Sequence, residues 1–378
     1  MSRIPSDTAT QSDAATPPIR RLGDVPLSVL DLAVVAEGSQ PADALRNSTD
    51  LVGRAEALGY RRYWVAEHHN MPGIASSAPG VLLAHLAAHS TTIRMGSGGV
   101  MLPNHPPLVV AEQFGTLSAL HPGRIDLGIG RAPGTDQMTA LALRRSPEAL
   151  SAEDFPQQLL DLLSFFTGRW PDDHPLRHIT AVPGLGQQPE VWLLGSSGFS
   201  AQLAGYLGLP FSFAHHFSAD NTVPALQLYR RSFRPSAVLQ HPYAMVAVAV
   251  VCADSEERAR WLAGPSKLSF ARLRSGHPGR LPTPEEAATH RYTPEEEPAL
   301  AGRSAGSVVG DPATVRAGLA ELLVRTGADE LMVTTMVHGH GDRVRSYELV
   351  AEAAGLRSGA EPPSIGGPPR TGQHPVAS

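Results

Sequence analysis

Residues 62–69 (RYWVAEHH), 93–101 (IRMGSGGVM) and 124–130 (RIDLGIG) are three short, largely apolar runs that lead into polar residues or glycines. The stretches between them, at 77–88 and 108–120, carry apolar residues at helical spacing. Adjacent parallel strands need a crossover connection, which is usually a helix. The three runs therefore predict neighbouring strands of a parallel sheet, and this alternation indicates an α/β fold.

The same unit recurs towards both ends of the chain. Further strands are predicted at 27–34, 191–195, 211–217, 243–252 and 330–337. Helices are predicted near 41–58, 155–166, 200–207, 223–233, 256–273, 313–326 and 343–354. Eight strands between 26 and 355 correspond to about 41 residues per unit, which is typical of a (β/α)8 TIM barrel with insertion loops. An open doubly wound sheet is the alternative that the pattern leaves open.

The domain organisation follows from composition. A single barrel domain is predicted from 25 to 356. Residues 1–24 and 357–378 are rich in Ser, Thr, Ala, Pro and Gly, too poor in apolar side chains to offset the entropy of ordering, and are predicted to be disordered tails. Residues 277–305 are polar and proline-rich without a helical or strand period, which predicts a mobile insertion that acts as a lid.

Charge and cysteine content restrict the partners of the 378-residue chain. Its net charge is −5 and it has no sustained basic run, which argues against nucleic acid or an anionic membrane. The single cysteine, Cys252, excludes an intrachain disulfide and a Cys-based zinc cluster. The longest apolar run, 245–253, is about half as long as a spanning helix, and residues 1–25 lack the apolar centre of a secretion signal. We expect a cytoplasmic protein with a small-molecule partner.

Two predicted strand ends suggest an anion site. Arg131 follows the fourth strand, and the turn at 195–198, Gly-Ser-Ser-Gly, follows the fifth and opens a helix. Such a turn presents free N–H groups and the positive end of the helix dipole, and a guanidinium can bind an anion with two hydrogen bonds. This combination predicts a phosphate site. The alternative is a surface ion pair at Arg131 beside a turn that only reverses the chain.

The second and third strands carry further candidates. His68 at the barrel mouth could act as a general acid or base, with Glu67 beside it; a core role for His68 and a bracing role for Glu67 are the alternatives. Gly98 and Gly99 interrupt an apolar strand, which is favourable where a bulge, an unusual peptide or a closely packed ligand requires glycine. Either a flat ligand or a simple barrel kink would explain them.

Histidine content raises the alternative of a zinc hydrolase. The chain has 16 histidines, including pairs at 68–69 and 215–216 and the HGH sequence at 338–340. However, no strand-end Asp follows them, and the single lysine, Lys267, falls in a predicted outer helix. We therefore predict no metal site.

Three motifs carry a resemblance to a known family. RYWVAEHHN (62–70), GSGGVMLPNHPP (96–107) and AEQFGTLSALHPGRIDLGIGRAPG (111–134), in this order and spacing, resemble the luciferase-like flavin-dependent monooxygenases of the bacterial luciferase superfamily. The resemblance implies a (β/α)8 barrel that binds reduced FMN at the C-terminal ends of its strands, with the deazaflavin F420 as the cofactor of other members. Gly130 departs from bacterial luciferase, which has a cysteine before the matched arginine.

The resemblance also implies roles for single residues. His68 would face the flavin and, with Glu67, take part in the oxygen chemistry. Gly98 and Gly99 would form a cis peptide beneath the isoalloxazine ring. The phosphate of FMN would be bound by Arg131, Gly195, Ser196 and Ser197, with Ser196 in place of an acidic residue.

The implied reaction is a two-component monooxygenation. A separate flavin reductase supplies FMNH2, which reacts with O2 to a C4a-hydroperoxyflavin, and one oxygen atom passes to a small organic substrate such as a polyketide-type natural product. An F420-dependent hydride transfer and a catalytically silent flavin-binding barrel are the alternatives. The resemblance further implies a homodimer, in which Val81, Leu82 and Leu86 either pack between subunits or belong to the barrel's own core.

Overall fold

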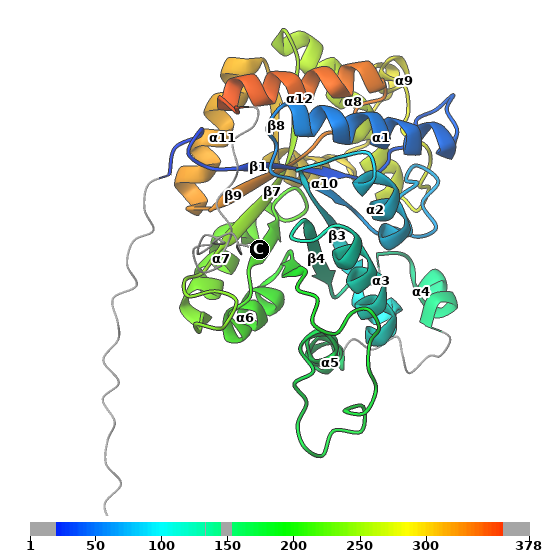
Figure 1. Cartoon of the computed structure of the whole chain (residues 1–378). Coiled ribbons are helices and arrows are strands. Elements are labelled where there is room, and N and C mark those ends of the chain that lie inside the picture. The colour runs from blue at the N-terminus through cyan, green and yellow to red at the C-terminus, as the bar shows by residue number, and fades with distance from the viewer. Residues whose placement is uncertain (1–19, 133, 145–152, 358–378) are drawn as a thin grey trace, which may run out of the picture.

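The computed structural model describes residues 20–132, 134–144 and 153–357, and shows a closed barrel of parallel strands surrounded by helices (Figure 1). The barrel strands are β1 (Leu27–Asp31), β2 (Arg62–Val65), β3 (Arg94–Met101), β4 (Ile125–Gly130), β5 (Glu190–Gly195), β6 (Phe211–Ala214), β7 (Ala244–Cys252) and β9 (Glu330–Thr334). Each of β1 to β6 pairs with the next, β6 pairs with β7, β7 with β9, and β9 with β1. The predicted TIM barrel is confirmed, because this order closes the sheet on itself.

Most connections between strands run through a helix on the outside of the barrel. These helices are α1 (Pro41–Ala57), α2 (Pro79–Ala87), α3 (Pro107–Leu120), α4 (Gln137–Arg144), α5 (Phe155–Thr167), α6 (Gly198–Leu207), α7 (Thr222–Ser232), α11 (Pro312–Thr326) and α12 (His340–Ala354). Four of them begin with a proline. The fixed φ of proline suits the first turn of a helix, and its lack of an N–H costs nothing there because the N–H groups of the first turn make no hydrogen bond within the helix. None of the helices in the described ranges is long and apolar enough to cross a membrane.

The segment between β7 and β9 is more regular than the sequence indicates. It contains α8 (Glu256–Arg274), α9 (Pro284–Thr289), α10 (Glu297–Ala305) and a short strand, β8 (Ser307–Gly310). The last three were not predicted, because α9 and α10 are short and bury few side chains, which leaves no readable period. The predicted lid, 277–305, therefore includes two helices. Whether it moves stays a prediction.

Strand β8 lies beyond the end of β6, along the same side of β7. Residues 244–247 of β7 pair with β6, and residues 249–252 pair with β8. The insertion thus leaves the barrel after β7 and returns to pair with that same strand. This geometry holds α10, which immediately precedes β8, over the C-terminal end of the barrel.

Part of the predicted N-terminal tail contacts the barrel. Arg20 forms an ion pair with Asp329, and Leu22 forms a β-bridge with Val25. The remainder of the two predicted tails, residues 1–19 and 358–378, lies outside the described residues.

Charged side chains fill the N-terminal end of the barrel. Arg62 bonds to Asp126 at 2.8 Å, to Glu190 at 2.9 Å and to Glu330 at 3.0 Å, and Arg94 pairs with Asp126. These five residues, here called the ionic layer, lie at the first or second position of their strands. Every charge in the layer therefore has an opposite charge within contact distance, which offsets the cost of burial.

An aromatic and aliphatic layer covers the ionic layer. Trp64, Trp192, Met245, Met332 and Leu30 form one buried cluster inside the barrel. The Trp64 and Trp192 rings meet edge to face at 5.4 Å, and Trp64 Nε1 donates to Asp126 at 2.9 Å. Because these two layers fill the lower barrel, open interior space remains at the C-terminal end of the strands.

Candidate active site

A cavity of about 750 Å³ lies at the C-terminal ends of the strands, where a barrel enzyme carries its active site. Residues from all eight barrel strands, or from the turns that follow them, contribute to its walls. Its volume is in the range of small-molecule and cofactor sites. Seven of the eight predicted site residues line it: His68, Gly98, Gly99, Arg131, Gly195, Ser196 and Ser197.

Glu67 is the exception. Its carboxylate is fully buried and accepts hydrogen bonds from His69 and His105, both at 2.9 Å, and from the Met101 N–H at 3.1 Å. Burial opposes its ionisation, but the hydrogen bonds from the two histidines prevail and lower the pKa of Glu67 to about 2. The structure thus places Glu67 as a brace behind the cavity, and does not bring it into the cavity as the catalytic prediction requires.

His68 and His69 point in different directions. His69 bonds to Glu67 behind the wall, whereas His68 lines the cavity and its Nδ1 has no hydrogen-bond partner among the described residues. Burial lowers the pKa of His68 below its usual value, partly against the attraction of Glu67. At neutral pH the imidazole is therefore uncharged, and its buried Nδ1 lies without a partner at the cavity wall.

The Gly98–Gly99 peptide is cis, as the resemblance implies, and the pairing of β3 with β4 shifts its register at this point. A Cβ atom at Gly98 would lie 2.6 Å from Leu30 Cδ1, and one at Gly99 would lie 2.7 Å from the carbonyl oxygen of Gly128. Both contacts are closer than real side chains allow. At Gly99 the obstacle is backbone, so only glycine fits there, whereas at Gly98 the end of the Leu30 side chain would have to move. The backbone itself forms this part of the cavity wall.

Arg131 and the start of α6 lie together at one end of the cavity. The Arg131 guanidinium stacks on Phe199, with its Cζ 4.2 Å from the ring centroid. Phe199 is the second residue of α6, which follows Ser196 and Ser197, and the Ser197 side chain does not cap the helix. The hydroxyls, the free N–H groups of the first turn and the guanidinium can all donate to one anion. The structure thus brings Arg131 and the start of α6 to one end of the cavity, and phosphate binding there stays a prediction.

Met101 occupies the space beside Gly130. A Cβ atom at Gly130 would lie 2.7 Å from the Met101 sulfur. This is the position where bacterial luciferase has a cysteine. The thioether of Met101 therefore fills part of the cavity wall next to Arg131 in this chain.

The histidines of the zinc-hydrolase alternative do not converge. His215 bonds to Thr222 at 2.7 Å and His216 to the carbonyl of Ala247 at 2.9 Å, while His338 and His340 bond to other elements. No group of three metal-ligating side chains gathers in the described part of the chain. Of these four histidines, only His216 lines the cavity, and burial lowers its pKa to about 4.

The structure adds a cavity wall that sequence reasoning missed. Helices α8 and α10 and strand β8 contribute Arg260, Lys267, Arg303 and several serines. Lys267 lies on α8 as predicted but reaches the cavity, and its ammonium stacks on Tyr292 at 4.3 Å. No motif identifies these residues, because the wall forms only when the insertion returns to β7. Among the described residues, those that line the cavity include no Asp or Glu.

Comparison with known proteins agrees with this geometry. The chain matches the family described as luciferase-like monooxygenase over residues 25–330. A protein of Escherichia coli (strain K12) named luciferase-like monooxygenase is 49% identical over 87% of this chain and 96% of its own. The structure of apo-MsnO8 is 39% identical, with a TM-score of 0.80 over 88% of this chain and 99% of that one.

A more distant structure shares the fold alone. The oxygenating constituent of 3,6-diketocamphane monooxygenase from Pseudomonas putida, solved in complex with FMN, is 17% identical, with a TM-score of 0.66 over 88% of this chain and 98% of that one. The family model matches well over half of the chain, and the Escherichia coli relative is covered over nearly its whole length. This protein therefore belongs to the luciferase-like monooxygenase family.

Proposed function

We propose that the protein is the oxygenating component of a two-component flavin monooxygenase. It binds FMNH2 supplied by a separate reductase and uses O2 to oxygenate a small organic substrate. One observation carries this proposal: a single cavity combines an anion site, at Arg131 and the start of α6, with an apolar wall that holds an unpartnered imidazole, His68. Family membership supports it.

The cavity residues fit a flavin mononucleotide. Arg131, Ser196 and Ser197 would hold the phosphate, and the Gly98–Gly99 backbone would face the ring system. A ring could approach that backbone closely because no side chain intervenes at these two positions. The wall around the glycines, with Leu30 and Trp64, is apolar and suits a flat aromatic group.

Bound reduced flavin would supply the two electrons that let one oxygen atom of O2 enter the substrate while the other leaves as water. The residues of the chain have two tasks in this reaction. The apolar wall excludes water from the reacting atoms. The neutral His68 imidazole can exchange a hydrogen bond or a proton with an oxygen atom held beside it, while Glu67 holds the neighbouring backbone in place.

The direct test is anaerobic titration of the purified protein with FMNH2, oxidised FMN and F420H2, followed by an oxygen pulse. We expect FMNH2 to bind more tightly than F420H2, and its oxidation to be slower in the protein than in buffer. Tight binding of F420H2 with no effect of oxygen would instead support the hydride-transfer alternative. Retention of FMNH2 with an unchanged oxidation rate would support the silent flavin-binding barrel.

His68→Ala separates binding from oxygen chemistry. We expect the affinity for FMNH2 to change by about twofold or less, because a flavin contact through one neutral side chain is weak. The absorbance transient after the oxygen pulse should decay faster than in the wild type. An unchanged decay would contradict the role of His68.

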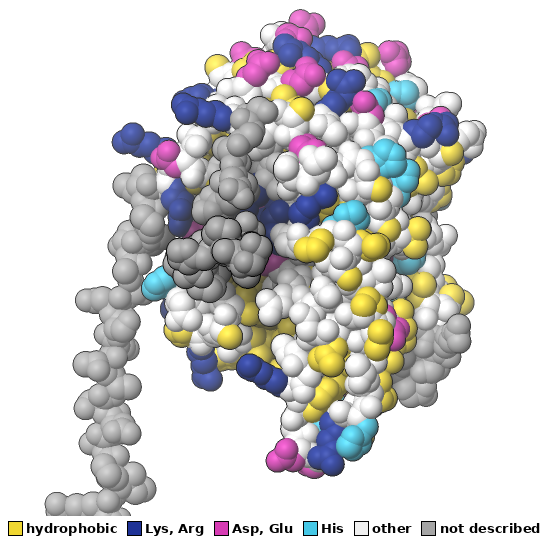
Figure 2. All heavy atoms as spheres, in the orientation of Figure 1, with side chains coloured by type: hydrophobic (Ala, Val, Ile, Leu, Met, Phe, Trp, Pro, Cys, Tyr) yellow, Lys and Arg dark blue, Asp and Glu magenta, His cyan; other side chains and the backbone are white. Residues whose placement is uncertain are grey.

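We also propose a homodimer. Of the three candidates, Leu82 and Leu86 are buried in the core, and only Val81, which is 74% exposed, is available to a second subunit. Hydrophobic side chains gather at the lower right in Figure 2, where α3, α4 and α5 lie in Figure 1. Leu120 and Met138 on these helices are exposed. Light scattering coupled to gel filtration should give twice the mass of one chain, and Val81→Asp together with Leu120→Asp should reduce it to one.

A further inference from the structure

Arg303 differs from Arg62 and Arg343, two buried arginines of the described residues. It lies on α10, is half-buried, and no carboxylate of the described residues is within ion-pair distance of it. By contrast, Arg62 contacts three carboxylates and Arg343 pairs with Asp31. Burial lowers the pKa of the Arg303 guanidinium, and no carboxylate opposes that effect. A cation in this position carries a desolvation cost that no carboxylate of the described residues offsets.

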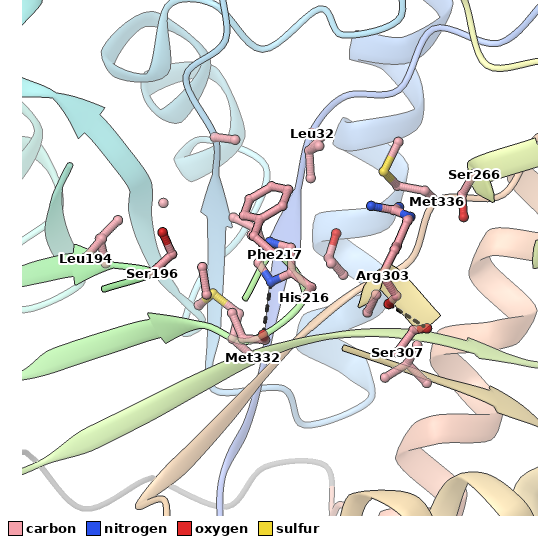
Figure 3. Close-up of a pocket in the computed structure, with 18 of the residues that line it drawn as sticks. Leu32, Leu194, Ser196, His216, Phe217, Ser266, Arg303, Ser307, Met332 and Met336 are labelled. Carbon is pink, nitrogen blue, oxygen red and sulfur yellow. Dashed lines mark hydrogen bonds between the residues drawn. The ribbon is translucent and has the colours of Figure 1, made fainter. Parts of the chain in front are cut away.

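The Arg303 side chain is oriented by its neighbours. Its Cζ lies 4.9 Å from the ring centroid of Phe270, which supports one side of the guanidinium. In Figure 3 it extends from α10 towards Met336 and Ser266, with Ser307 below it. Arg303 therefore lines the cavity together with Met336, Ser266 and Ser307, and the two serine hydroxyls donate to backbone carbonyls.

The other two cations on this wall are already engaged. Arg260 is exposed and pairs with Glu256 at 2.7 Å. Lys267 is also exposed, and its ammonium stacks on Tyr292. Arg303 is thus the cation of this wall that is both sheltered from solvent and without a charged partner.

Arg303 lies away from the proposed phosphate site. In Figure 3, Ser196 and Leu194 are on the left and Arg303 is on the right, with His216, Phe217 and Met332 between them. Ser196 and Arg303 thus lie on opposite sides of the cavity in this view. The two ends therefore present two separate positive charges, and the space between them is lined mainly by apolar side chains.

We propose that Arg303 binds the anionic group of the substrate, and that this substrate is an organic acid with an apolar body. The carboxylate or sulfonate receives hydrogen bonds from the Arg303 guanidinium, and the body lies along Met332 and Met336 towards the flavin. A planar guanidinium suits a carboxylate because it donates two parallel hydrogen bonds. The inference rests on the proposed function for the flavin end of the cavity, but its test does not require catalysis.

The test measures two kinds of ligand, C8 compounds and FMNH2, on the same set of proteins. The flavin-free protein is titrated with octanoate, octanesulfonate and, as the neutral control, octanamide, using tryptophan fluorescence or calorimetry. The same proteins are titrated anaerobically with FMNH2. We expect octanoate to bind the wild type at least about tenfold more tightly than octanamide, and Arg303→Gln to abolish that difference.

Arg131→Gln and Arg260→Gln are the matched variants. Arg303→Gln should keep its FMNH2 affinity, Arg131→Gln should lose FMNH2 affinity and keep octanoate, and Arg260→Gln should keep both. Arg303→Lys should retain part of the preference for octanoate, because it keeps the charge and loses the fork of donors. Thermal melting of each variant shows whether it is folded. If Arg303→Gln does not fold, Arg303→Lys is used in its place.

Three results would overturn the inference. The first is that the wild type binds octanoate and octanamide equally well, or binds none of these ligands. The second is an unchanged preference for octanoate in Arg303→Gln. The third is loss of octanoate binding in Arg131→Gln, which would place the acid at the phosphate site. Failure of FMNH2 to bind, with octanoate still dependent on Arg303, would contradict the proposed function alone.

Discussion

The two ends of the barrel use arginine in opposite ways. At the N-terminal end, Arg62 and Arg94 are surrounded by Asp126, Glu190 and Glu330 within the ionic layer. At the C-terminal end, Arg131 and Arg303 face a cavity whose described lining residues include no Asp or Glu. Arginines of the first kind are neutralised by the protein itself. Those of the second kind have charges that remain available to a ligand.

The difference indicates how each arginine contributes. A buried cation surrounded by carboxylates is part of an ionic network, and removing one charged partner from such a network strongly lowers folding stability. A cation that faces a cavity without a charged partner costs stability in the free protein and contributes when an anion arrives. Substitutions at the two ends should therefore affect different quantities: folding stability at the ionic layer, and ligand affinity at the cavity.

Arg62→Met should have the largest effect. It leaves three buried carboxylates without their central cation, which typically costs about 3–5 kcal/mol. The same change at Arg303 removes an unpaired cation and should leave the free energy of unfolding unchanged or raise it. Urea unfolding of both variants measures this. An equal loss at the two positions would mean that Arg303 is also structural.

Arg131→Ala should weaken FMNH2 binding by about 1.5–3 kcal/mol, the size of a charge-assisted hydrogen bond. Phe199 stacks on the Arg131 guanidinium from outside the anion site. Phe199→Leu should therefore weaken FMNH2 binding less than Arg131→Ala does. Anaerobic titration gives the affinities, and thermal melting should show little change in either variant. Identical titration curves for Arg131→Ala and the wild type would rule out the phosphate site.

Acid should lower the stability of the fold through His216. The pKa of His216 falls from its usual 6.5 to about 4 because the ring is buried, so the folded state favours the uncharged form. Above pH 6.5 His216 is uncharged in both the folded and the unfolded chain, and the free energy of unfolding keeps its full value. As the pH falls from 6.5 towards 4, the unfolded chain takes up the proton first, and the free energy of unfolding decreases. We expect a loss of about 2 kcal/mol from His216 between pH 7.5 and 5.

His216→Gln should remove that contribution. Urea unfolding at pH 7.5, 6 and 5 should show a shallower decline in the variant than in the wild type. Asp126 of the ionic layer should not contribute in this range, because burial, which raises its pKa, is outweighed by Arg62 and Arg94, which hold that pKa below its usual value. Parallel pH profiles for variant and wild type would contradict the assignment to His216.

Arg260→Ala should have the smallest effect. This arginine lies on the cavity rim, but it is exposed and paired with Glu256. Solvent and salt screen such pairs. We expect no measurable change in melting temperature or in octanoate affinity. A loss of octanoate affinity like that of Arg303→Gln would show that the rim and not the interior recognises the anion.

The sequence predicts the barrel well because each strand corresponds to a short run of apolar residues that can be recognised without knowing its contacts. Strands such as β4 and β7 are nearly continuous runs of buried residues, and the polar residues that follow them fall at one end of a parallel barrel. That rule, with the family resemblance, is enough to place His68, Arg131 and Ser196 in one cavity. The alternation of side chains also explains why His68 faces the cavity and His69 does not.

The sequence does not predict the insertion wall, because its elements are defined by contacts between distant segments. Strand β8 has four residues and exists through pairing with the end of β7. Arg303 stands in a polar stretch with no motif, so nothing local distinguishes it from a surface arginine. Glu67 was assigned to catalysis for a related reason: its brace partners His105 and Met101 lie more than thirty residues along the chain.

The return of the insertion to β7 has a consequence for how this protein can diversify. Residues 253–306 leave from one end of a strand and come back beside it, so they form a cassette whose two ends are anchored at a fixed place on the scaffold. Exchanging the cassette leaves the register of the eight barrel strands and the Arg131 end of the cavity as they are. Replacing one continuous stretch of the gene would thus change the cavity wall that carries Arg303 without changing the barrel.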